Sequence, residues 1–234
     1  IQITQIAQDT IRAVKTVEDT EKTELLRNEA ENLVEPVYVM NADVAEHRVS
    51  FVNSVFDTLI AEKLLIEQST DVLLRPERIN ALKQSMKEII KSQPDLALSD
   101  AQLEAFLTVS VEDIKQTRDA IDDIVQERLS KAIRKEALPT EKIEAEAEVV
   151  STEKIDRTLL NPSIAIVKVA IVETEKLDPI ITEERIAQAR SSVEPTKVLQ
   201  GQIIIREGEA IDRETIRQME LLGMLDAEGS NKPI

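Results

Sequence analysis

The chain has 234 residues and a formal net charge of −16, contains no cysteine and is only 2% aromatic. The acidic balance argues against a nucleic-acid-binding protein, because such binding depends on Lys and Arg contacts to phosphate. The lack of cysteine excludes disulfides, thiolate catalysis and cysteine-ligated zinc. Four glycines and 32% charged residues favour a mainly helical protein with a core of Leu, Ile, Val and Ala.

The N-terminal part of the chain predicts short strands around a helix. Residues 11–17 are β-branched enough for a strand, and residues 18–34 form a charged helix that ends before Pro36. Residues 37–40 are a second strand candidate. A long amphipathic helix follows over 43–66, since its apolar residues recur at spacings of three and four.

The middle of the chain predicts a series of helices with clear start signals. Pro76 suits the first position of one helix, and a further helix begins at Pro139 and runs to about residue 156. Ser99 and Ser110 each open a capping pattern, and the second of these starts a helix from 111 to about 137.

The most apolar run lies at residues 164–172, where Lys168 interrupts it. It is too short for the ~20 apolar residues of a membrane-spanning helix. We interpret it as a buried strand. The sequence also lacks an N-terminal signal region and begins abruptly, so we expect it to be a piece of a longer protein.

The C-terminal stretch over 182–225 combines turn residues with a β-branched run. Residues 198–211 resemble a hairpin, with a short strand entered and left through turns at Gly201 and Gly208. Asp212 can cap the next helix, and Gly223 occupies the place of a left-handed residue after its end.

An internal repeat joins the two ends of the chain. Seven residues between 23 and 39 recur between 182 and 198 at a constant offset of 159 residues, including Val34-Glu35-Pro36 and Val193-Glu194-Pro195. Each copy predicts a helix, an exit forced by proline and a strand. We therefore expect an α+β, mainly α-helical fold, in which a helical lobe (43–159) is inserted into a small α/β layer formed by 1–42 and 160–234.

No constellation of residues for catalysis stands out. His47 is the one histidine, it has no partner of metal-ligand type, and we expect an exposed or capping helix residue. Acidic pairs such as Asp122 and Asp123 are abundant in so acidic a chain and carry little information. The sequence offers no credible nucleophile, base pair, metal cluster or cofactor motif, so we predict that the chain is not an enzyme by itself.

Both ends of the sequence carry a resemblance to a known family. The segment T-E-x5-A-x3-V-E-P, followed by V-L-Q-G-Q-I-I-I-R-E-G-E-A-I and a helix ending L-L-G-M-L, resembles the extracellular domain of membrane-bound, seven-transmembrane HD-family phosphohydrolases. Residues 18–40 resemble that family's first helix and strand. The middle matches only by its helical character, and 160–181 departs from the shorter connection expected there.

The resemblance implies an extracellular domain at the face of the bacterial cell membrane, tethered through flanking transmembrane helices that this sequence lacks. It also implies a parent similar to cyclic di-AMP phosphodiesterases, with the catalytic His-Asp pair and metals in a separate cytoplasmic domain. No catalytic, cofactor or metal residue transfers to this chain. The candidate structural or signalling motif consists of Val34, Glu35, Pro36, Val193, Glu194, Pro195, Gly201, Gly208 and Gly223.

Three functions remain open at this point. A sensory or regulatory domain requires a ligand or partner that prefers one of two arrangements, either an unknown small ligand or a protein outside the cell. A structural or assembly domain acts through protein contacts, including a possible homodimer. A free-standing enzyme is the third, and the missing chemistry argues against it.

Overall fold

The structure is a computed structural model that describes residues 5–70 and 73–225. The chain divides into two compact units. One unit lies within residues 1–37 and 178–234, and the other comprises Tyr38–Leu177. Most described residues are helical and the strands pair only in twos, so the predicted α+β, mainly helical class is confirmed. In the part that the structure describes, none of the helices has the length and apolarity needed to cross a bilayer.

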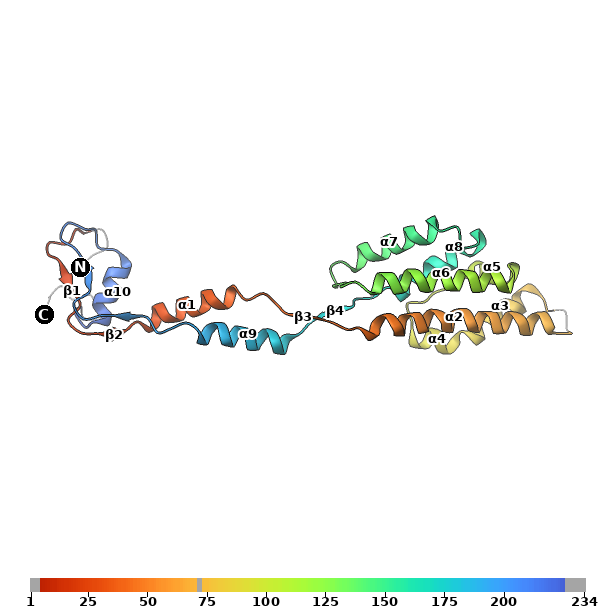
Figure 1. The fold of residues 1–234 in the computed structure, drawn as a ribbon, viewed down its shortest axis with the longest axis horizontal. Coiled ribbons are helices and arrows are strands. Elements are labelled where there is room, and N and C mark those ends of the chain that lie inside the picture. Colours follow the sequence, from red (N-terminus) through yellow and green to blue (C-terminus); the bar gives the residue numbers. More distant parts are fainter. Residues whose placement is uncertain (1–4, 71–72, 226–234) are drawn as a thin grey trace. The chain divides into compact units, whose positions relative to one another are not determined.

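The unit of residues 38–177 is a helical bundle closed by a two-stranded ribbon (Figure 1). α2 packs along α6, and α7 packs on α8. The elements are β3 (Tyr38–Met40), α2 (Asp43–Gln68), α3 (Arg75–Ser85), α4 (Lys87–Ser92), α5 (Asp100–Thr108), α6 (Val111–Leu129), α7 (Leu138–Ser151), the 3-10 helix η1 (Arg157–Leu159), α8 (Leu160–Ala170) and β4 (Glu175–Leu177).

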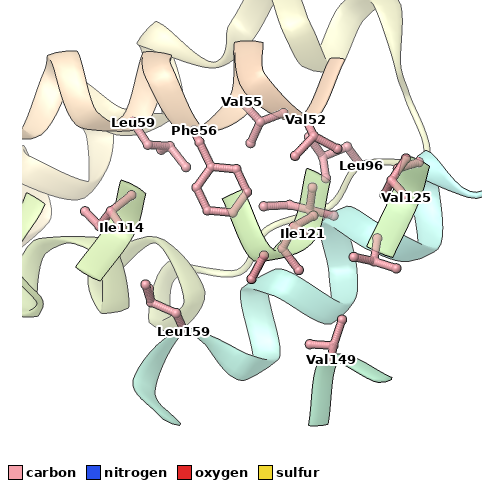
Figure 2. Packing of buried hydrophobic residues seen from close by; sticks show 14 of the residues in the cluster. Val52, Val55, Phe56, Leu59, Leu96, Ile114, Ile121, Val125, Val149 and Leu159 are labelled. Atoms are coloured by element: carbon pink, nitrogen blue, oxygen red, sulfur yellow. The ribbon is translucent and has the colours of Figure 1, made fainter. Parts of the chain in front are cut away.

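The core of this unit is mainly aliphatic, as the composition predicts, and includes two phenylalanines. Figure 2 shows Phe56 among its aliphatic neighbours. Phe56 from α2 meets Phe106 from α5 edge to face, with ring centroids 5.8 Å apart. Val52, Leu59 and Ile121 are fully buried beside them. The three-and-four spacing read from the sequence of α2 is therefore the spacing of its buried face.

The predicted helix starts are confirmed. Ser99 and Ser110 accept hydrogen bonds from the backbone N–H groups of Gln102 and Asp113, and both capping boxes are complete. Proline occupies the first turn of α3 and of α7, where no intrahelical N–H bond is lost.

Two helix ends differ from the prediction. α6 ends at Leu129 instead of near 137, and α7 ends at Ser151 instead of near 156. After α6 the backbone of Ile133 bonds to a distant segment, because its N–H donates to Thr174 Oγ1 and its carbonyl accepts from the Thr174 N–H. This pairing buries Ile133 outside any helix.

The strand predicted over 164–172 is wrong, because residues 164–170 lie in α8. The buried positions Ser163, Ile166, Val167 and Ala170 follow helical spacing, whereas strand alternation would place Lys168 on one face with the isoleucines. Lys168 instead reaches Glu146 of α7, with 2.5 Å between Nζ and Oε2. Residues 160–177 therefore lie in the helical unit, and the boundary expected at 160 falls between 177 and 178.

The other unit is built from the two ends of the chain. Its elements are β1 (Ile11–Arg12), β2 (Val17–Glu18), α1 (Thr20–Asn32), α9 (Pro179–Ser191), β5 (Lys197–Val198), β6 (Ile203–Ile205) and α10 (Arg213–Leu221). β1 pairs antiparallel with β6, and β2 pairs antiparallel with β5. A small core of Ala7, Ile205, Ile211 and Met219 joins β6 to α10.

The hairpin-like pairing expected over 198–211 is not formed. β5 and β6 each pair with an N-terminal strand instead of with each other. The turns before and after β6 also bond to the N-terminal segment, since the N–H of Gly201 donates to Ala13 O and that of Gly208 donates to Ala7 O. Both glycines adopt positive φ, at 81° and 84°, and Gly223 follows α10 with φ of 72°.

Candidate functional site

The two copies of the repeat pack against each other as an antiparallel helix pair of α1 and α9 (Figure 1). The N–H of Val37 donates to Thr182 Oγ1 at 3.0 Å, and the N–H of Thr196 donates to Thr23 Oγ1 at 2.9 Å. These are the same contact made twice, because Thr182 is the repeat counterpart of Thr23 and Thr196 is that of Val37. The expected pairing of the two copies is confirmed, and it follows a local pseudo-two-fold.

The contacts at the helix starts extend the repeat by one residue pair. The N–H of Asp19 donates to Thr196 O, and the N–H of Asp178 donates to Val37 O, both at 2.8 Å. Each aspartate also caps its own helix, through the N–H of Lys22 or of Ile181. The two aspartates share the 159-residue offset, but three unlike residues separate each of them from its threonine, so sequence identity alone does not reveal this part of the repeat.

The Val-Glu-Pro segments end the two helices without meeting each other. Each follows the end of one helix and leads to a backbone N–H that bonds the first turn of the other helix, through Val37 and Thr196. Glu35 and Glu194 are exposed, and neither forms an ion pair with a described residue. Each proline keeps the glutamate before it out of the helical conformation, so the motif positions backbone and presents no reactive side chain.

One ionic cluster ties the last helix to the first. Arg217 on α10 forms a bidentate ion pair with the Asp19 carboxylate, with Nη1 2.5 Å from Oδ1 and Nη2 2.7 Å from Oδ2. Arg217 Nη2 also donates to Glu214 Oε1 at 2.7 Å. The Asp19 side chain is 1% exposed. Hydrogen bonding from Arg217 lowers the pKa of Asp19 and of Glu214, despite burial. No pattern in the sequence marked Arg217.

Surface hollows lie between described residues of the helical unit. The hollow of about 720 Å³ lies beside the start of α2 and is lined by His47, Arg48 and Lys135, among others. His47 is exposed, as predicted. Among residues 5–70 and 73–225, no group of three or more His, Asp or Glu side chains is arranged to hold a metal ion.

Comparison with known proteins identifies the family. A family model described as 7TM-HD extracellular matches residues 2–226. The chain is 32% identical over 242 residues to the cyclic-di-AMP phosphodiesterase PgpH of Listeria monocytogenes serotype 1/2a (strain 10403S), a match that covers 97% of this chain and 33% of the relative.

A second relative has the same name and a similar extent. The chain is 28% identical over 229 residues to the cyclic-di-AMP phosphodiesterase PgpH of Bacillus subtilis (strain 168), over 98% of this chain and 32% of the relative. The chain thus spans about a third of the length of the curated relatives it matches. No solved structure matches the chain. The family match covers nearly the whole sequence and confirms the resemblance and the extracellular location, and the chain belongs to the 7TM-HD extracellular family.

Proposed function

We propose that this chain is the non-catalytic sensory or regulatory domain of a membrane-bound HD phosphohydrolase that hydrolyses cyclic di-AMP. The relatives' names supply the substrate, and the chain matches only the extracellular domain, so hydrolysis belongs to another part of the parent. The domain then acts by biasing the membrane helices that flank it in such a parent.

The observation that carries this proposal is the joining of the two chain ends in one unit. β1 and β2 pair with β6 and β5, and Asp19 binds Arg217 of α10. A rearrangement of the α1–α9 pair therefore changes the support of α10 as well. Such a mechanical link is what a signal arriving outside needs in order to reach segments at both ends of the domain.

The test measures cyclic di-AMP hydrolysis by the full-length parent in native membranes. Arg217→Leu releases α10 from Asp19, and we expect it to change the hydrolysis rate by several fold at equal membrane abundance. Arg213→Leu is the matched control, because Arg213 lies exposed on the same helix without an ion pair to any described residue. Unchanged hydrolysis in Arg217→Leu and after deletion of the whole domain rules out the regulatory role.

A structural or assembly role is the second candidate, and the helix pair supplies its support. Several apolar side chains of the helix pair face solvent: Leu33 after the end of α1 is 83% exposed, Ile180 on α9 69% and Leu25 on α1 56%. Apolar surface of this kind marks contact sites in many proteins. The test is sedimentation of the isolated chain, where association that Leu33→Ser and Ile180→Ser abolish favours assembly, and a monomer at every concentration excludes it.

A further inference from the structure

Basic side chains gather around two adjoining hollows of the helical unit, against the acidic balance of the chain. The larger hollow, of about 720 Å³, is lined by His47, Arg48, Lys135 and Lys176. The smaller, of about 360 Å³, is lined by Lys142, Lys168 and again Arg48. Gln93 and Val172 also line both. We call this pair of hollows the Arg48 site. A concentration of positive side chains is unusual in a chain whose net charge is −16.

Arg48 lies at the junction of the two hollows and lacks a carboxylate partner. Its Nη1 donates to Gln93 Oε1 at 2.8 Å, which orients the guanidinium. It forms no ion pair with a described residue, unlike Arg118 and Arg128 of the same unit. Burial lowers the pKa of Arg48, which means that its charge is partly desolvated without compensation. An anion placed in the hollow supplies the missing partner.

The remaining charges of the site leave room for such an anion. Lys135 and Lys142 form no ion pair in the described part of the chain, whereas Lys168 is occupied by Glu146. The lining carboxylates are Asp95 and Glu173, and Glu173 lies 3.3 Å from the ammonium of Lys176. Cations therefore outnumber anions at the surface of the two hollows.

The wall of the larger hollow is partly apolar. Val44, Phe51, Leu138 and Val172 line it beside the cationic groups. A cationic group next to apolar side chains is the usual pattern of a site for a small organic ligand. We propose that the Arg48 site binds a small organic anion, with a carboxylate or phosphate head at Arg48 and a short apolar body along this wall. This inference deepens the proposed sensory function by naming a ligand class, and it rests on that function for its biological meaning.

The test measures binding to the untagged chain by ligand titration, followed in proton NMR spectra. His47 lines the larger hollow and is the one histidine of the chain, so its ring signals report on this site without assignment. The probes are hexanoate, hexyl phosphate, inorganic phosphate and hexyltrimethylammonium. We expect saturable shifts with hexanoate or hexyl phosphate, weaker binding of inorganic phosphate and none of the cation. The two hexyl anions distinguish a carboxylate from a phosphate head.

Variants locate the binding. Arg48→Gln removes the guanidinium, and we expect the affinity to fall by about tenfold or more, since hydrogen bonds to charged groups are the strong ones. Lys135→Gln changes an exposed side chain without a partner and is expected to weaken binding by a few fold while the fold is kept. Arg185→Gln is the control of equal charge change, because Arg185 is exposed on α9 in the other unit. Its affinity should equal that of the unchanged chain.

Several results would overturn the proposal. These are no saturable shift with either hexyl anion, equal binding of the cation or of inorganic phosphate, or full binding in both Arg48→Gln and Lys135→Gln. Failure here leaves the proposed regulatory role intact, because that role is tested separately by cyclic di-AMP hydrolysis in the full-length parent.

Discussion

Asp19 and Arg217, which lie far apart in the sequence, form a bidentate ion pair with N–O distances of 2.5 and 2.7 Å. The same carboxylate caps α1 through the N–H of Lys22. Its repeat counterpart Asp178 caps α9 but has no arginine partner among the described residues. The pseudo-two-fold of the helix pair is therefore broken where the C-terminal helix docks.

Asp19→Asn should destabilise the start of α1 far more than Asp178→Asn destabilises the start of α9. Asp19→Asn removes one partner of a buried ion pair, which costs about 3 kcal/mol. Asp178→Asn keeps a side-chain oxygen that caps α9 and should cost well below about 1 kcal/mol. Hydrogen exchange of the α1 and α9 backbone amides, compared between each variant and the unchanged chain, measures both effects. Equal losses of protection in the two variants would contradict a special role for Arg217.

The Asp19–Arg217 ion pair predicts that acid destabilises the start of α1. The hydrogen bond from Arg217 holds the pKa of Asp19 below its usual value of 3.8. A lowered carboxyl pKa gives stability that is present above the unfolded value and lost as pH falls through the folded one. Protection of the first turn of α1 should therefore fall below about pH 4. In Asp19→Asn this part of the pH dependence should disappear.

The hydroxyl groups of Thr23 and Thr182 make the same two hydrogen bonds in the two copies. Each hydroxyl donates to the carbonyl of its own capping aspartate at 2.6 Å and accepts a backbone N–H from the other copy. Valine in place of either threonine leaves that N–H without its acceptor, at a cost of about 1–2 kcal/mol. Thr23 is 2% exposed, so its variant should be the more costly.

The measurement for these threonines is exchange of single amides. Thr23→Val should speed exchange at Thr196, and Thr182→Val should speed exchange at Val37, with little effect across the pair. Loss of protection at both amides in either variant would show that the helix pair opens as one unit.

Asp122 on α6 makes the helical unit more stable when this carboxyl is uncharged. Burial raises the pKa of Asp122 to about 6, although Asn53 donates to its Oδ2 at 2.8 Å. A raised folded pKa means that stability is complete below the unfolded value near 3.8 and declines as pH rises through 6. After a discount for its partial exposure, the penalty at neutral pH is about 1–2 kcal/mol.

Asp122→Asn should therefore raise the free energy of unfolding at pH 7.5 by about 1 kcal/mol and leave it unchanged at pH 4. Urea unfolding followed by circular dichroism at both pH values measures this difference. Asp123→Asn is the matched control, because Asp123 is the exposed neighbour. A gain in Asp122→Asn that is equal at the two pH values would contradict the burial argument.

The features predicted from sequence are those that short-range chemistry determines. The capping serines and the repeat copies were found because residue type and spacing alone specify them. The strand prediction over 164–172 is wrong because β-branched composition is a weaker signal there than the helical spacing of Ser163, Ile166 and Val167. Spacing was the better signal, since it reflects which residues the bundle buries.

Features that depend on distant partners were not predictable in the same way. The strand partners of β5 and β6 lie at the other end of the chain, so local turn residues could not reveal them. Arg48 and Arg217 differ from other arginines only in what surrounds them: Gln93 without a carboxylate in one case, and a buried aspartate in the other. Sequence patterns around either residue carry no sign of that difference.

Arg128 forms ion pairs with three glutamates of α7 and should be essential to the packing of α7 on α6. Its guanidinium lies 3.1 Å from Glu141, 2.5 Å from Glu144 and 2.5 Å from Glu148, with the arginine side chain 9% exposed. Hydrogen bonding to Glu148 is the main cause that raises the pKa of Arg128. Arg128→Met leaves three carboxylates on one helix face without a counter-charge, and we expect a loss of about 3 kcal/mol.

Two further measurements separate charge from packing. Urea unfolding at 1 M salt should recover part of the loss in Arg128→Met, because salt screens the repulsion among the exposed parts of the glutamates. Adding Glu141→Gln, Glu144→Gln and Glu148→Gln to Arg128→Met should restore more stability than the same three changes give in the unchanged chain. Arg157→Met, at an exposed arginine of the same unit, controls for the loss of one positive charge. If the three changes are simply additive with Arg128→Met, the arginine contributes through its apolar stem and not through the glutamates.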